Sequence, residues 1–205
     1  MIKSAELENS AYEFEAKMPL RHAVPLGLQH VFAMFVGNRE ALLQRLASNE
    51  DDLYIMGQPP EQKDAMCEAF ANNPLVLVAP PSHPLVGQAG VQPQRLKDEP
   101  FILREPGSGT RLTAERFFAH HGITLKNRLE VGSNEAIKQT VAGGLGLAVL
   151  SATTVVSELA LGELVMLDVQ GFPLMRHWHV VYPQGKRLSA ATLAFKDWLF
   201  AHRPT

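Results

Sequence analysis

Short apolar segments alternate with helix-type segments from about residue 50 to the end of the chain. Two of these segments, Pro74–Pro80 (PLVLVAP) and Leu145–Leu150 (LGLAVL), are continuous apolar runs, which is typical of strands covered on both faces. Helical spacing follows at Thr110–His121 and Asn134–Ala142. The alternation predicts an α/β fold with mostly parallel sheets.

The composition limits the size and the partners of this fold. With 205 residues and 46% hydrophobic content, the chain is long enough for one large domain or two small ones. A net charge of −2 provides no basic field for nucleic acid. The single cysteine, Cys67, excludes an internal disulfide and favours a reducing compartment, so we expect a cytoplasmic protein. The acidic start does not resemble a signal peptide, and the longest apolar run is too short to span a membrane.

The segment Phe101–Leu112 (FILREPGSGTRL) has the pattern of a strand, a small-residue turn and a helix start. Backbone N–H groups at such a helix start have no partner within the helix, so they can bind an anion. Arg104 and Arg111 flank the turn and add positive charge suited to a carboxylate or a phosphate. The alternative is a helix cap beside two solvated arginines, and the spacing alone does not separate the two interpretations.

A second helix start follows the next predicted strand, Arg128–Val131. Ser133 is the expected N-cap, and Glu135 lies in the first turn, where a negative side chain suits the helix dipole. Ligands of open α/β sheets bind beyond the carboxyl ends of the strands. Two helix starts that converge there would form a better anion site than either alone.

Catalytic and metal-binding patterns are weak in this sequence. It contains neither a P-loop nor a G-x-S-x-G motif, and Cys67 has no histidine partner nearby in the sequence. His177 and His179 would share one face of a strand, but with no evident third ligand we interpret them as partly exposed strand residues. We therefore expect no enzymatic activity, no cofactor and no metal.

Several segments, in order and with similar spacing, resemble the effector-binding domain of LysR-type transcriptional regulators, above all those of the Calvin-cycle (RuBisCO) operon. The resemblance covers about residues 36–205. It rests on DDLYIMGQPP, NPLVLVAPPSHPL, EPFILREPGSGTR, VGSNEAIKQTVAGGLGLAVLS, LGELVMLDVQGFPLMRHWHVVYPQGKRLS and the final helix.

The resemblance implies two Rossmann-like subdomains joined by two crossover strands, as in type 2 periplasmic binding proteins. Residues 1–78 and 181–205 would form the first subdomain and residues 79–180 the second, with effectors bound in the cleft between them. The positions that match the family's effector site are Met56, Gly57, Gln58, Arg104, Glu105, Ser108, Gly109, Thr110, Arg111, Ser133 and Asn134.

Residues 1–35 depart from the family pattern, and LRHAVPLGLQHVFAMF within them is similar to the start of a nucleobase permease. The winged helix-turn-helix through which the family binds DNA is also not recognisable, so we do not expect this chain to bind an operator by itself.

The leading hypothesis is a sensor of a small anionic, phosphorylated metabolite that controls transcription of carbon-fixation genes as a homodimer or tetramer. The helices expected at Asn38–Ala47 and Thr110–His121 are the candidate dimer surface. The alternative is a solute-binding protein of a transport system, which a monomer in solution would favour.

Overall fold

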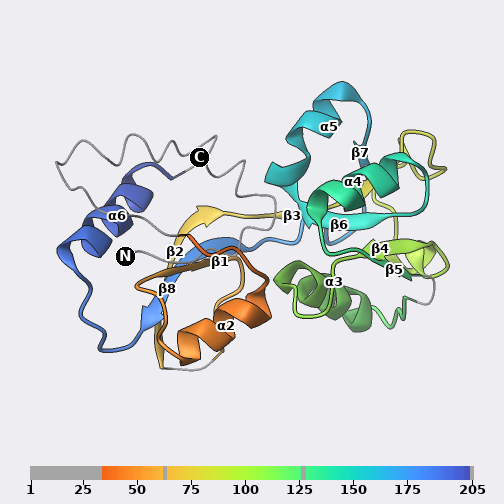
Figure 1. The fold of residues 1–205 in the computed structure, drawn as a ribbon. Coiled ribbons are helices and arrows are strands. Elements are labelled where there is room, and N and C mark those ends of the chain that lie inside the picture. The colour runs from red at the N-terminus through yellow and green to blue at the C-terminus, as the bar shows by residue number, and fades with distance from the viewer. Residues whose placement is uncertain (1–33, 62–63, 126–127, 204–205) are drawn as a thin grey trace. The chain divides into compact units, whose positions relative to one another are not determined.

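The structure is a computed structural model that describes residues 34–61, 64–125 and 128–203. These residues form two compact units (Figure 1). Unit 1 comprises the described residues up to Asn72 and those from Arg176 onward, and unit 2 comprises Asn73–Met175. Both divisions fall a few residues before the subdomain boundaries expected at 78 and 180. The atypical residues 1–33 lie outside the described residues.

Unit 1 is built on a three-stranded antiparallel sheet with β8 at its centre. Its strands are β1 (Tyr54–Met56), β8 (His177–Pro183) and β2 (Ala65–Asn72). Successive residues of β8 serve opposite faces, because side chains alternate along a strand. Val180 packs with α6 (Ala190–Ala201), and Val181 packs with α2 (Arg39–Ala47). One helix therefore covers each face.

Unit 2 contains a second antiparallel sheet, in which β3 (Leu75–Ala79) lies between β6 (Ala148–Ser151) and β7 (Val165–Met166). Alternate residues of β3 belong to two different hydrophobic clusters. Ala114 and Phe118 of α3 (Gly109–His120) join one cluster, whereas Ile137 and Val141 of α4 (Asn134–Ala142) join the other. Because both faces of β3 are covered by helices, all five of its residues are buried, as the PLVLVAP run predicted.

The strand β4 (Phe101–Leu103) of unit 2 has a parallel neighbour on each side. It pairs with β5 (Arg128–Glu130) in parallel, and the segment at Leu147 runs parallel to it on the other side. There, Ile102 N–H donates to the Leu147 carbonyl at 2.8 Å, and Leu147 N–H donates to the Pro100 carbonyl at 2.9 Å. Gly146 makes this approach possible, since a Cβ at its position would lie 2.6 Å from the Pro100 carbonyl oxygen.

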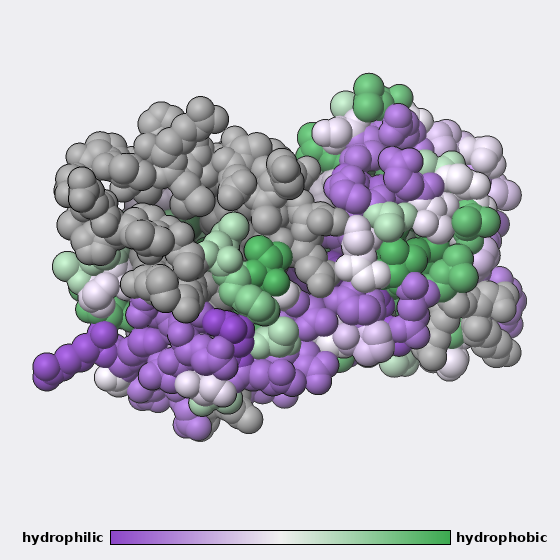
Figure 2. Space-filling view, in the orientation of Figure 1, coloured by the Kyte–Doolittle hydropathy of each residue, from purple (hydrophilic) through white to green (hydrophobic). Residues whose placement is uncertain are grey.

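The remaining described elements of unit 2 are the 3-10 helices η2 (Pro93–Leu96) and η3 (Ala152–Val155), followed by α5 (Val156–Leu161). No residue of α5 is buried, and Val156 and Leu161 expose 50% and 73% of their surface. Figure 2 shows this apolar area over α5 at the top of the view, above a largely polar surface. Leu159 is the α5 side chain that packs against the core of unit 2.

Two features of the fold differ from the sequence-based expectation. Among the described strands, β4 and β5 are the named pair with parallel pairing, whereas the other named pairs are antiparallel. The sequence pattern also does not predict the strand β2, because AMCEAFAN is rich in small residues, and its burial does not alternate regularly. Its pairing with the long strand β8 holds it in the sheet.

Candidate functional site

The first part of the candidate site is the turn between β4 and α3 in unit 2. Ser108 is the N-cap of α3, and its Oγ accepts a hydrogen bond from the Arg111 backbone N–H at 3.5 Å. Gly107 adopts a positive φ of 87°, which a glycine allows without steric cost. The predicted strand, turn and helix start are therefore present, with Gly109, Thr110 and Arg111 in the first turn of the helix.

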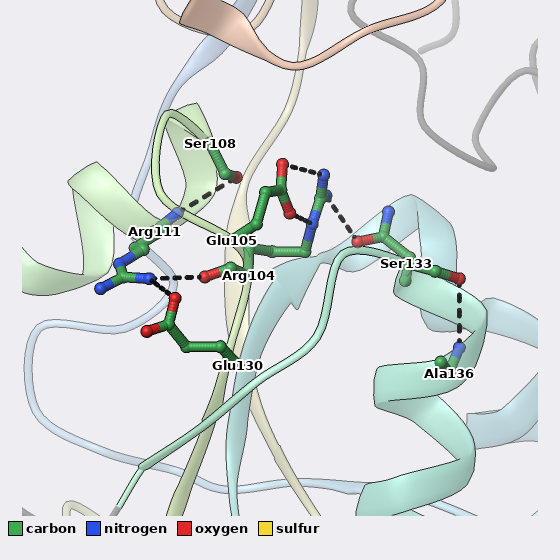
Figure 3. Close-up of polar contacts among 8 residues, drawn as sticks. Arg104, Glu105, Ser108, Arg111, Glu130, Ser133 and Ala136 are labelled. Atoms are coloured by element: carbon green, nitrogen blue, oxygen red, sulfur yellow. Dashed lines mark hydrogen bonds and ion pairs between the residues drawn. The ribbon is translucent and has the colours of Figure 1, made fainter.

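The second part is the turn between β5 and α4. Ser133 is the N-cap of α4, as predicted, and its Oγ accepts from the Ala136 N–H at 3.3 Å. Because β4 and β5 are parallel neighbours, their carboxyl ends meet at one edge of the sheet. The N-termini of α3 and α4 consequently begin at the same edge (Figure 3).

Arg104 links these two turns. Its Nη1 donates to Asn134 Oδ1 at 2.9 Å, while its Nε and Nη2 donate to the two carboxylate oxygens of Glu105 at 2.8 Å and 3.2 Å. Arg104 and Asn134 are both 7% exposed, so this bond lies in the interior of the site. Arg104 thereby holds the start of α4 next to the end of β4.

Arg111 is held by a separate set of acceptors. Its Nη1 donates to the Arg104 carbonyl at 3.1 Å and to Glu130 at 2.6 Å, and its Nε donates to Glu115 at 2.9 Å. Burial acts to lower the pKa of Arg111, but the bonds to Glu130 and Glu115 outweigh it and raise the pKa above its ordinary value. Arg111 therefore joins α3 to β5 as well as lying at a helix start.

Lys138 is a further cation, buried one helical turn after Asn134 on α4. Its ammonium contacts Glu135 at 2.6 Å and Glu158 of α5 at 2.7 Å. Burial acts to lower the pKa of Lys138, but the two carboxylates outweigh it and raise the pKa. Lys138 thus ties the helix that carries part of the site to α5.

The structure brings together the predicted site residues of unit 2 at one sheet edge. Met56, Gly57 and Gln58 belong to unit 1, at the end of β1, and their contact with a ligand stays a prediction. Gln58 Oε1 is buried without a hydrogen-bond partner, while the Gln58 carbonyl accepts from Arg39 at 3.2 Å. The unit 2 residues are Arg104, Glu105, Ser108, Gly109, Thr110, Arg111, Ser133 and Asn134.

Sequence reasoning missed the carboxylates that hold the buried cations. The pair Arg111–Glu115 has the i, i+4 spacing of a helical ion pair and was detectable in the sequence. Glu130 and Glu158 carry no such local signal, because each meets its partner only through tertiary packing.

Neither a metal site nor a membrane span is found in the described part of the chain. Residues 34–61, 64–125 and 128–203 contain no cluster of three or more histidine, cysteine or acidic residues placed to hold a metal ion. Within the same residues, no helix has the length and apolar character to cross a bilayer.

Comparison with known proteins gives consistent matches over most of the chain. The family model for the LysR substrate binding domain matches residues 29–204. A RuBisCO operon transcriptional regulator of Acidithiobacillus ferrooxidans is 63% identical over 82% of this chain and 54% of its own length. The transcriptional activator CmpR of Synechocystis is 47% identical over 82% of this chain and 55% of its own length. The chain thus spans about half the length of these curated relatives, which are named as regulators and not as enzymes.

Solved structures also match over nearly the full chain. The regulatory domain of Synechocystis CcmR, in complex with 2-PG, superposes with a TM-score of 0.89 and 42% identity, covering 98% of this chain and 95% of that one. The effector-binding domain of QuiR, in complex with shikimate, superposes with a TM-score of 0.83 at 20% identity, covering 98% and 95%. The second match supports the two-subdomain α/β fold alone.

Proposed function

The chain belongs to the LysR substrate-binding domain family, and from this premise we propose that it is the effector-sensing module of a regulator of carbon-fixation genes. The proposed ligand is a small phosphorylated anion. One observation carries this proposal: the starts of α3 and α4 meet at one sheet edge and are joined by the bond between Arg104 and Asn134. Helix starts favour anions because their N–H groups and dipoles point toward them.

The CcmR match suggests which anion to test. That regulatory domain is in complex with 2-PG, 2-phosphoglycolate, and is 42% identical to this chain. A phosphate at one helix start and a carboxylate near the other would suit the paired N-termini of unit 2. We therefore propose 2-phosphoglycolate, or a metabolite that likewise carries a phosphate, as the effector.

Replacing Thr110 tests the proposed site. Thr110 lies in the first turn of α3, half-buried, where its hydroxyl can reach a ligand at the helix start. We expect Thr110→Ala to weaken 2-phosphoglycolate binding by about tenfold or more, as loss of one hydrogen bond to a charged group does. Isothermal titration calorimetry would measure the change.

Thr113→Ala is the matched control, since it removes the same atoms one turn further along α3. The Thr113 hydroxyl donates to the Gly109 carbonyl at 2.8 Å within the helix. The control should bind the ligand as the unsubstituted protein does, with a similar thermal midpoint. Equal affinity for Thr110→Ala and the unsubstituted protein would refute the assignment of this residue to the site.

The role in a whole regulator extends this proposal. We infer that DNA is contacted by other parts of the regulator, through the family's winged helix-turn-helix, because this domain has a net charge of −2. We further propose that it acts in the cytoplasm as a homodimer or tetramer, with α2 and α3 as the contact surface. The relatives' names favour this role over that of a transport protein.

A further inference from the structure

The cations of the candidate anion site are each paired with carboxylates in the structure. Arg104 contacts Glu105, and Arg111 contacts Glu115 and Glu130. Lys138 contacts Glu135 and Glu158. An anion that reaches the two helix starts therefore meets arginines that are already paired with carboxylates, and its attraction to the site depends on the helix N-termini unless a carboxylate is displaced.

Glu105 differs from the other carboxylates in how it holds its cation. Its two oxygens meet Nε and Nη2 of Arg104, the two-pronged arrangement in which arginine also binds the carboxylate of a small molecule. The Arg104 side chain is 8% exposed, whereas the Glu105 side chain is 23% exposed. Glu105 is thus the more accessible member of the pair, and it lies in the turn that precedes α3.

Arg104 keeps a place in the structure without this pair. Arg104 Nη1 donates to Asn134, and the Arg104 carbonyl accepts from Arg111. Neither bond involves Glu105. Arg111, in contrast, is gripped by two carboxylates, so displacing one would leave the other in place. Arg104 is therefore the cation whose Nε and Nη2 meet one carboxylate, that of Glu105, among the bonds described.

We propose that Glu105 is an internal competitor, whose carboxylate occupies the Arg104 fork and is displaced by the carboxylate of the bound effector. This inference rests on the function proposed above. Glu105 lowers the affinity for the effector and makes the site selective for ligands that carry a carboxylate. A ligand that brings a carboxylate replaces the bonds that Arg104 loses. A ligand with a phosphate alone leaves the pair intact and binds at the helix starts.

Glu105→Gln tests the proposal in the full chain. The amide keeps the shape of the side chain but lacks the charge, so it competes poorly for a guanidinium. We expect calorimetry to measure an affinity for 2-phosphoglycolate that is about five- to tenfold higher than that of the unsubstituted protein. For inorganic phosphate we expect a clearly smaller gain. Glu105→Ala, which removes the competitor entirely, should change both affinities in the same direction.

Glu163→Gln is the matched control, because Glu163 is exposed in the turn between α5 and β7 and the substitution removes the same charge. It should leave both affinities unchanged. Thermal midpoints close to that of the unsubstituted protein would show that Arg104 stays anchored in the Glu105 variants.

The outcomes separate this inference from the proposed function. Suppose that the unsubstituted protein binds 2-phosphoglycolate and that Glu105→Gln binds it equally or more weakly. Glu105 is then no competitor, and the proposed function stands. The same conclusion follows if the substitution raises the affinities for 2-phosphoglycolate and for phosphate by the same factor. If 2-phosphoglycolate binds only after Glu105 is replaced, the result supports the role of Glu105 as a competitor. Absence of binding in all of these proteins would overturn both ideas.

Discussion

Arg111 donates hydrogen bonds to three acceptors, so its side chain is a structural crosslink as well as a candidate ligand contact. The bonds join the first turn of α3 to Glu130 at the end of β5 and to the carbonyl of Arg104. Removing this guanidinium would leave Glu130 and Glu115 facing each other without their shared cation. A loss of binding in an Arg111 variant would therefore mix ligand contact with framework, and Thr110 separates the two.

His179 should make the stability of the fold depend on pH. Burial lowers the pKa of His179, electrostatic repulsion from His177 adds to this, and the nearby backbone of His177 and Met56 offsets it only in part. Its Nδ1 is buried without a hydrogen-bond partner. Because the folded pKa lies below the unfolded value of about 6.5, the neutral form is preferred in the fold. The stability contributed by neutral His179 is fully present above the unfolded pKa and is lost as the pH falls through the folded pKa.

Urea unfolding at pH 7.5 and pH 5 would measure this effect. The fall in unfolding free energy between the two pH values should be smaller in His179→Gln than in the unsubstituted protein. His120→Gln, which changes an exposed histidine of α3, is the control and should retain the full fall. An equal fall in all three proteins would show that His179 does not contribute.

At the scale of elements, α5 is attached to unit 2 by the packing of Leu159 and by an ion pair between Glu158 and Lys138. None of its residues is buried, and Glu158 reaches the Lys138 ammonium of α4, with side-chain exposures of 12% and 6%. We expect Lys138→Met to lower the free energy of unfolding by about 3 kcal/mol, since it leaves the half-buried carboxylate of Glu158 without its cation. Urea titration would measure the loss.

The pair Lys97–Asp98 provides a control for this prediction. Its side chains are 64% and 78% exposed and lie 4.0 Å apart, so Lys97→Met should change the free energy by no more than about 0.5 kcal/mol. The double variant Lys138→Met with Glu158→Leu should recover part of the loss, because no buried charge remains unpaired. Similar losses for Lys97→Met and Lys138→Met would contradict the importance of burial.

The predictability of the elements follows the range of the interactions that define them. Residues close in sequence predict the buried strand β3, the helix α4 with its cap Ser133, and the start of α3 near Ser108. They do not predict the strand β2, because its partner β8 lies more than a hundred residues later and its own pattern is weak. The Arg104–Asn134 bond escaped detection for the same reason, since it joins residues 30 positions apart.

At the scale of the whole molecule, the connectivity of the two units differs. Unit 2 is one continuous segment with two hydrophobic clusters of its own, and the bonds described above for Arg104 and Arg111 join residues of this unit. Unit 1 joins segments from the two ends of the chain through the pairing of β8 with β1 and β2. Substitutions at the anion site therefore act on a unit that is continuous in sequence, although its sheet pairs β3 with the distant strands β6 and β7.

The proposed homodimer gives a prediction for the assembled protein. The outward faces of the two candidate helices differ in charge: α2 exposes Glu40 and Gln44, while α3 exposes Arg116 and His120. If α2 of one copy packs against α3 of another, Glu40 and Arg116 lie on complementary surfaces. We expect light scattering to give a molar mass of about twice 22.6 kDa. Arg116→Glu should shift the protein toward monomer, because like charges then face each other.

Charge reversal on the opposite helix completes the test. Adding Glu40→Arg to Arg116→Glu should restore the dimer, since the attraction is re-established with the signs exchanged. Lys97→Glu, which reverses an exposed charge after η2, should leave the mass unchanged. A monomeric unsubstituted protein would refute the dimer. If Arg116→Glu remains dimeric, the interface lies elsewhere. A contact between α2 and α3 would place the new carboxylate against Glu40 and weaken the dimer.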